Sequence, residues 1–185
     1  MKTTKDLMSR LLKDIAVELH EEFDRNFERK AFFGRSWEKR KREGKGSLLL
    51  VTGKLRRSLR YEITDNTVRW TSSENYANIH NEGGDIIVTA GMKAHFWKKY
   101  YEAAGGITYN VKTRGMAKTK RNVKLSRDAE FYKAMALQKV GKIMRIPERR
   151  FIGNAPEVNS SIERIVNNHL KGIEILIKNQ LKQRK

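Results

Sequence analysis

The 185-residue sequence contains no cysteine, only two prolines and no long apolar run. The absence of cysteine excludes disulfide bonds and thiolate metal ligands. No stretch approaches the roughly 20 apolar residues that a membrane-spanning helix needs. The N-terminal segment is interrupted by Asp6, Lys13, Asp14 and Glu18, which argues against a signal peptide or an anchor. We therefore expect a soluble intracellular product, a single domain over residues 1–185, and no membrane partner.

Acidic residues are scarce beside basic ones: 40 Lys and Arg stand against 21 Asp and Glu, a net charge of +19. Residues 91–150 hold most of the excess, with 16 basic and 4 acidic side chains. Such a segment attracts polyanions, and nucleic acid is one candidate partner. A solvated face, or a surface for an acidic protein, explains the same charge equally well.

The residue types of common catalytic sites are few and scattered. The four histidines, His20, His80, His95 and His169, form no HExxH-like pair. No carboxylate pair stands with a histidine, and no acidic cluster of the nuclease kind is present. We expect no catalytic residue, no metal and no cofactor. His80 alone has a motif-like setting, and there a hydrogen-bonded structural role is favoured over a chemical one.

The stretch LLLVTGKLRRSLRYEI, residues 48–63, looks at first like a phosphate loop. Such a loop needs a glycine five residues before Gly53, and Ser or Thr after Lys54. The sequence has Leu48 and Leu55 at these positions, so a nucleotide site is not expected. Instead, Thr52 is predicted to cap a short helix. Leu55 and Leu59 face inward in this helix, and three arginines face outward: Arg56, Arg57 and Arg60.

Two long amphipathic helices are predicted, one at each end of the chain. From Thr4 to about Lys30, apolar residues recur every four positions. A terminal helix follows Ser160, which forms a capping box with Glu163. Charged residues fill the face of the first helix opposite its apolar stripe, which argues against a role on a membrane surface.

Short strands are predicted between the long helices. Alternating residues 59–63 and 67–71, joined by Asp65-Asn66, predict a hairpin with Leu59, Tyr61, Ile63, Val68 and Trp70 on its buried side. A short helix capped by Ser72 or Ser73 and stopped by Gly83-Gly84 comes next, then a strand at 85–89. Residues 146–153 form an extended segment in which Pro147 favours a sheet edge or a strand start. The fold class is α+β: a small antiparallel sheet flanked by long N-terminal and C-terminal helices.

Residues 91–145 are interpreted as a basic, partly helical insertion. An aromatic helical segment is broken by Gly105-Gly106, and a second helical segment ends at Gly141. The aromatic residues either stack on single-stranded nucleic acid or form a small core that holds the insertion together. They are Phe96, Trp97, Tyr100, Tyr101 and Tyr109. Residues 36–47 are predicted to be a mobile basic loop.

Three sequence blocks, in order, resemble the phage virion morphogenesis family, the tail-completion proteins of Mu-like and P2-like phages and prophages. The resemblance covers about residue 37 to the C-terminus, and the insertion departs from the shortest members. The resemblance implies a structural role for the motif residues of each block. In the first block, residues 52–58, these are Thr52, Gly53, Leu55, Arg56 and Ser58; in the second, residues 76–84, they are Tyr76, Ala77, Ile79, His80, Gly83 and Gly84; in the third, residues 147–153, they are Pro147, Arg149, Phe151, Ile152 and Gly153.

The resemblance implies a non-enzymatic role in the virion: completing the tail or neck so that head and tail join. It also implies a homo-oligomeric ring around the path of the DNA, other neck and tail proteins as partners, and assembly in the host bacterial cytoplasm. Seven basic residues are candidates for contact with DNA in transit or with an acidic neighbour: Arg56, Arg57, Lys118, Lys120, Arg121, Arg149 and Arg150. The alternative is a free-standing basic nucleic-acid-binding protein.

Overall fold

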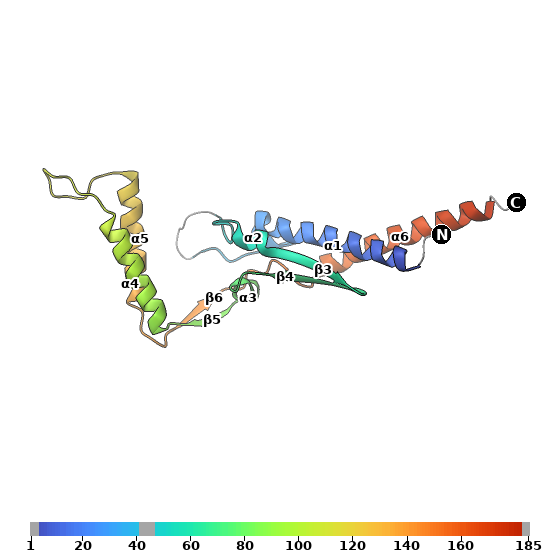
Figure 1. Cartoon of the computed structure of the whole chain (residues 1–185), viewed down its shortest axis with the longest axis horizontal. Helices are drawn as coiled ribbons and strands as arrows, with labels where there is room; N and C mark the ends of the chain where they lie inside the picture. Colours follow the sequence, from blue (N-terminus) through green and yellow to red (C-terminus); the bar gives the residue numbers. More distant parts are fainter. Residues whose placement is uncertain (1–3, 41–46, 183–185) are drawn as a thin grey trace. The chain divides into compact units, whose positions relative to one another are not determined.

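A computed structural model describes residues 4–40 and 47–182 of the chain (Figure 1). The chain divides into two compact units. The framework unit consists of residues 1–84 and 147–185, and the inserted unit consists of residues 85–146. The predicted α+β class, with long helices at both ends, is confirmed. Within these described residues, the strands lie in three separate two-stranded sheets rather than in one sheet.

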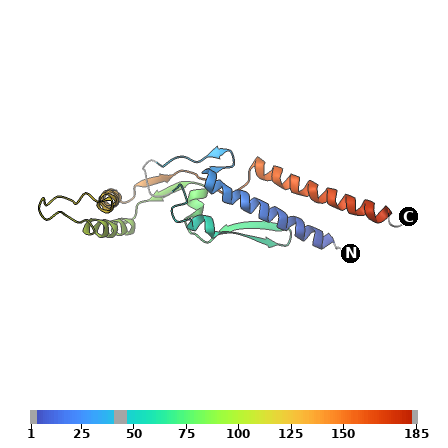
Figure 2. The ribbon, with the colours of Figure 1, turned by 90° about the horizontal axis from the view of Figure 1, so that it is seen from above.

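Two long helices, α1 (Thr4–Arg29) and α6 (Pro156–Lys182), pack together in the framework unit (Figure 2). Their apolar stripes meet in a buried cluster that includes Ile15, Leu19 and Phe23 of α1, and Val158 and Ile165 of α6. Burying such a side chain contributes about 1.5 to 3 kcal/mol relative to exposure. The pairing is therefore a main source of stability for this unit.

The predicted capping box of the last helix is wrong. Helix α6 already begins at Pro156, so Ser160 lies within the helix and its hydroxyl donates to the Pro156 carbonyl oxygen over 3.0 Å. Proline suits a first helical position, because its fixed φ is helical and its missing N–H would have had no partner there. The Ser160–Glu163 spacing is a coincidence of composition.

Helix α1 ends at a short hairpin that the sequence did not predict. Lys30 has a φ of 55°, a left-handed conformation that commonly ends helices. Strands β1 (Ala31–Phe32) and β2 (Arg35–Ser36) then pair antiparallel. The start of the predicted 36–47 loop is thus part of a hairpin, and residues 41–46 of that loop lie outside the described residues.

The second hairpin follows a short helix, as predicted. Helix α2 (Lys54–Ser58) runs into β3 (Leu59–Thr64), which pairs antiparallel with β4 (Thr67–Ser72). Leu59 is buried, whereas Ile63 is 38% exposed, so the inward face stops short of the turn. Thr52 is not the N-cap. Gly53 takes that position with a φ of 67°.

Helix α3 (Ala77–Asn81) begins later than predicted. Its N-cap residue is Tyr76, which makes no side-chain capping hydrogen bond, so neither Ser72 nor Ser73 caps it. The Ser72 hydroxyl instead lies 2.7 Å from the Ser58 hydroxyl, which links the end of α2 to the end of β4. The predicted stop at the glycine pair is confirmed, because Gly83 and Gly84 follow the helix with positive φ.

The inserted unit is an α-helical hairpin on a pair of strands. Strands β5 (Gly84–Ile87) and β6 (Ile143–Ile146) pair with each other, and helices α4 (Ala90–Gly105) and α5 (Lys120–Ala136) pack together. Helix α4 ends at the glycine pair as predicted. The second helix starts at Lys120 and ends at Ala136 rather than at Gly141. Pro147 follows β6 instead of starting a strand. The assignment of the whole chain to a single domain stays a prediction.

Candidate functional site

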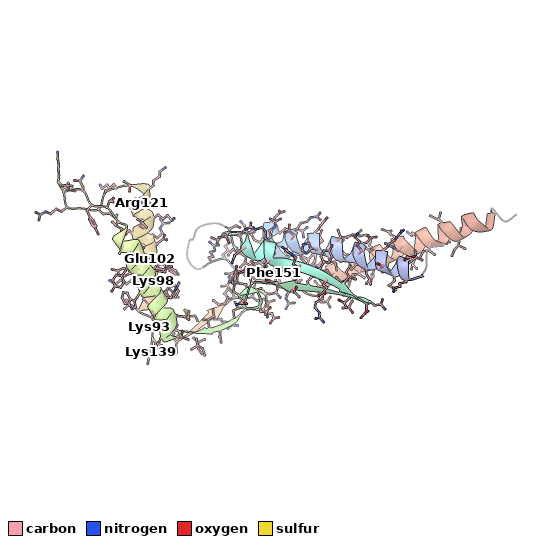
Figure 3. All side chains as sticks on the ribbon, in the orientation of Figure 1. Lys93, Lys98, Glu102, Arg121, Lys139 and Phe151 are labelled. Atoms are coloured by element: carbon pink, nitrogen blue, oxygen red, sulfur yellow. The ribbon has the colours of Figure 1, made fainter. Side chains whose placement is uncertain are left out.

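The three motif blocks of the sequence meet around one buried phenylalanine in the framework unit. Phe151, from the third block, has no solvent-exposed surface and packs in a cluster with residues from α1, α2, β3 and α3. Figure 3 labels its position within this unit. The other buried members of the cluster are Phe27, Trp37, Leu55, Leu59 and Ala77. Residues that are far apart in sequence thus build one joint, which we call the Phe151 joint.

Hydrogen bonds fix the third block against the second. The Arg149 amide donates to the His80 carbonyl oxygen over 2.8 Å. The Asn81 side-chain oxygen then accepts from the Phe151 and Ile152 amides, over 2.9 and 3.1 Å. These bonds pair the backbone amides of residues 149, 151 and 152. The segment has no regular secondary structure, so these amides would otherwise lack a hydrogen-bond partner. The joint is therefore held by directional bonds as well as by packing.

Helix α1 and the residues after it close the other side of the joint. The Asn26 side chain, which is fully buried, donates to the Phe151 carbonyl oxygen over 3.2 Å and accepts from the Phe33 amide over 3.0 Å. The Trp37 indole N–H donates to the Arg150 carbonyl oxygen over 2.6 Å. Both residues lie outside the three blocks, and sequence reasoning missed their role.

The first block is tied to α1 by charge. Arg56 forms salt bridges with Asp24 and with Glu28, the latter over 2.7 Å. The side-chain hydrogen bonds, first with Asp24 and then with Glu28, raise the pKa of Arg56 above its ordinary value. Arg56 was a candidate for contact with DNA, and in this structure its guanidinium is engaged by two carboxylates of its own chain.

His80 and Arg149 line a hollow of about 230 Å³ beside the joint, together with residues 48, 49, 51, 52, 54, 55 and 76 and Arg40. Burial, with a smaller contribution from the Arg149 charge, lowers the pKa of His80 below 6.5. Burial likewise lowers the pKa of Arg149. Arg149 donates to the Glu38 carbonyl oxygen over 3.1 Å, Arg40 donates to the Ser47 carbonyl oxygen, and Lys54 pairs with Glu74. The cations that line the hollow are thus engaged within the chain.

An apolar groove of about 600 Å³ lies elsewhere on the framework unit, where α1, β4 and α6 adjoin the end of the third block. Its apolar lining includes Leu12, Val68, Trp70, Ile152 and Ile162. Beyond the part of α6 that packs on α1, the same helix exposes Leu170, Ile175 and Ile177 by 57%, 58% and 52%. The unit therefore carries both an apolar groove and exposed apolar side chains on α6, of which Leu170 and Ile177, about two turns apart, share one face that no described residue covers.

The seven basic candidates are divided between the two units. In the framework unit, Arg57 donates to the Thr52 carbonyl oxygen over 2.9 Å, and Arg150 pairs with Glu148 over 3.1 Å. Lys118, Lys120 and Arg121 belong to the inserted unit, where all three are exposed. Contact of any of these residues with DNA or an acidic neighbour stays a prediction.

Among the aromatic residues of the insertion, Phe96 supports the interpretation as a small core, whereas stacking on nucleic acid stays a prediction. Phe96 of α4 lies 6.3 Å from Phe131 and 6.4 Å from Tyr132 of α5, measured between ring centroids. It therefore belongs to a small core between the two helices. Tyr101 and Tyr109 are instead 65% and 62% exposed.

Within the described residues, no group of three or more His, Asp or Glu side chains is placed to hold a metal ion. The described helices also include none that is long and apolar enough to cross a bilayer. What the geometry presents is a braced joint, an apolar groove and an exposed basic segment. These features define a protein of mixed α+β class whose evident surfaces suit contact with other macromolecules.

Comparison with known families identifies the family of the protein. The model of the phage virion morphogenesis family matches residues 1–171 of the chain, so the protein belongs to this family. The match includes all three blocks, both sides of the insertion and α1, and it ends within α6. No curated protein and no solved structure matches the chain. The predicted family is thus confirmed, and the protein acts in the morphogenesis of a phage virion.

Proposed function

We propose that the protein completes the tail or neck of the particle so that head and tail join, as a non-enzymatic structural component. The observation that carries this proposal is the family match across 1–171, which spans the framework unit and the inserted unit alike. The contacts of the Phe151 joint support this structural role. The joint consists of packed apolar side chains and of hydrogen bonds in which the Phe151 and Ile152 amides donate to the Asn81 side chain. Such a joint makes a rigid body.

We further propose that several copies form a closed ring, in which the exposed face of α6 in one copy occupies the apolar groove of the next. A closed ring needs two different complementary patches on each copy. The framework unit supplies both, since the groove accepts apolar side chains and α6 offers the exposed apolar side chains of Leu170 and Ile177. A second copy of this chain is thus the occupant that the surfaces fit.

Deleting the gene from the phage tests the completion role. We expect filled heads and full-length tails that do not join in electron micrographs, and loss of infectious particles that the wild-type gene restores in trans. Normal particle yield would rule the role out. Empty heads, or the absence of full-length tails, would place the protein at another step of morphogenesis.

The ring is tested with the variant Leu170→Glu/Ile177→Glu. Both side chains are more than half exposed, so the helix should stay folded, and a charge on the contact face should block association. The matched control is Asn167→Glu/Asn168→Glu on exposed positions of the same helix. We expect closed oligomers by light scattering for the wild type and the control, and monomers that fail to complement for the variant. A variant that restores particle yield would overturn the ring contact.

The alternative function, a free nucleic-acid-binding protein, is favoured by the charge of the inserted unit. Residues 85–146 carry 14 basic and 4 acidic side chains, a net of +10. This alternative predicts that complete, infectious particles form without the protein. The deletion experiment therefore separates the two functions directly.

A further inference from the structure

The inserted unit contains a long segment without any negative charge. Between Glu102 and Asp128 the sequence has seven cations and no carboxylate. All seven side chains are exposed: Lys112, Arg114, Lys118, Lys120, Arg121, Lys124 and Arg127. They lie in the loop after α4 and in the first turns of α5. We call residues 107–127 the basic finger.

The cations of the basic finger differ from the other basic candidates in their partners. Arg56 and Arg150 pair with carboxylates of the framework unit, and Arg57 and Arg149 donate to carbonyl oxygens there. By contrast, the first six cations of the finger form no salt bridge with any residue that the structure describes. Their charge is therefore available to an external partner.

The loop of the basic finger is held in one shape. Asn122 is fully buried, and its amide donates to the carbonyl oxygens of Thr108 and Ala117 over 2.7 and 2.8 Å. Its oxygen accepts from the Thr108 amide over 3.2 Å. Tyr109 forms a bridge with Met116 across the loop. A loop ordered before binding loses less conformational entropy when a partner binds.

Two of the cations stand where they cost stability. Lys120 and Arg121 lie in the first turn of α5, which contains no acidic residue. A helix dipole disfavours positive charge at the N-terminus, by about 0.3 to 1 kcal/mol per charge at exposed positions. Local preferences are typically broken at functional sites. The charge at this end of the helix thus has a reason other than folding.

We propose that the basic finger contacts the phosphate backbone of duplex DNA without reading its sequence. Lys and Arg side chains contact phosphates, and asparagine side chains are among those that read bases. Both asparagines of the finger are engaged inside it: Asn122 as above, and Asn110 as acceptor for the amides of Lys112 and Thr113. Duplex DNA is the polyanion with which a protein of virion morphogenesis shares the particle. The contact goes beyond tail or neck completion and does not depend on it.

The test measures binding of the purified full-length protein to a labelled duplex of about 30 base pairs, by fluorescence anisotropy, at salt from about 50 to 200 mM. The finger variant is Lys118→Glu/Lys120→Glu/Arg121→Glu. Acidic residues suit the first turn of a helix, so this variant should fold. The matched control, Lys93→Glu/Lys98→Glu/Lys139→Glu, makes the same charge change on the inserted unit. Figure 3 labels these three lysines and Arg121, which lies at the end of the helical pair that carries the finger.

For the wild type we expect log Kd to rise with log salt with a slope of about 3 to 6, since each phosphate contact contributes about 0.9. The finger variant should lose at least about tenfold more affinity than the control variant. An equal loss in both variants would show a diffuse charge effect and overturn the proposal, as would a wild type that does not bind the duplex. Displacement of the duplex by polyglutamate as readily as by unlabelled DNA would point to an acidic protein instead and would also overturn it.

Discussion

The side chain of Asn26 in α1 donates a hydrogen bond to the backbone carbonyl oxygen of Phe151, although 125 positions separate the two residues in sequence. The same side chain accepts from the Phe33 amide. One buried amide thus connects the first helix, the hairpin after it and the last sequence block. The Phe151 joint depends on this polar residue as much as on its apolar ones.

Replacing Asn26 by alanine should lower the free energy of unfolding by about 1 to 3 kcal/mol, because the Phe151 carbonyl and the Phe33 amide then lose their partner inside the joint. Urea denaturation followed by circular dichroism measures this change. Asn168→Ala, at an exposed position of α6, is the control and should shift stability by less than about 0.5 kcal/mol. Equal effects of the two substitutions would contradict the role of Asn26.

Arg56 and Asp24 should show an energetic coupling of about 1 kcal/mol in a double-mutant cycle of Arg56→Ala and Asp24→Ala. Their side chains are 29% and 37% exposed, which weakens the pair relative to a buried one. The control cycle combines Arg57→Ala with Asp24→Ala. Arg57 is the exposed neighbour of Arg56 and donates its hydrogen bond to the Thr52 carbonyl oxygen. We expect no coupling in that cycle. A coupling of zero for Arg56 as well would mean that the salt bridge does not join α2 to α1.

The stability of the protein should fall in mild acid because of His80. Burial and the charge of Arg149 lower the pKa of His80 in the folded state below 6.5, so the unfolded chain binds the proton more readily. This residue's contribution is constant above about pH 6.5 and is lost as the pH falls below it. Unfolding free energies at about pH 7.5 and pH 5.5 measure the loss. His80→Gln should reduce it, whereas His95→Gln, at an exposed position, should not. A loss that is the same in all three proteins would exclude His80 as its source.

Gly84 and Gly172 should respond oppositely to alanine. Gly84 has a φ of +144°, and a Cβ there would stand 2.8 Å from Cδ1 of Ile79, so Gly84→Ala should destabilise by about 1 to 3 kcal/mol. Gly172 lies within α6, and a Cβ at this position would meet nothing within 4 Å. Gly172→Ala should therefore stabilise by about 0.5 to 1 kcal/mol. Thermal unfolding of the two variants checks both signs, and the same sign in both would contradict this reading of the backbone.

The sequence predicts well those elements in which apolar residues recur regularly, either every four positions over a long stretch or at every second position. The four-residue recurrence of apolar side chains predicts α1, and alternation around Asp65-Asn66 predicts the β3–β4 hairpin. Helix starts are predicted poorly, because Ser and Thr are common in loops and mark a cap only where the backbone turns appropriately. Ser160 and Thr52 show this, since a proline and a glycine begin those helices instead.

The joint could be anticipated only in part. The three blocks contain Leu55, Ala77 and Phe151, which do meet, but Asn26 and Trp37 lie outside the blocks. A sequence signal for Asn26 exists: it stands three residues after Phe23 and next to Phe27, hence on the apolar face of a helix. An amide on such a face indicates a buried hydrogen bond. Which backbone group it meets depends on tertiary structure, and local periodicity carries no information about that.

The chain leaves the framework unit after Gly84 and returns to it at Pro147, and a hydrogen bond from Arg149 to His80 joins the two flanks within that unit. The inserted residues also begin and end with strands that pair with each other. Entry and exit are therefore closed on both sides by backbone bonds. A change of length within residues 85–146 should therefore leave the Phe151 joint closed, so the inserted unit and the framework unit can vary independently of each other.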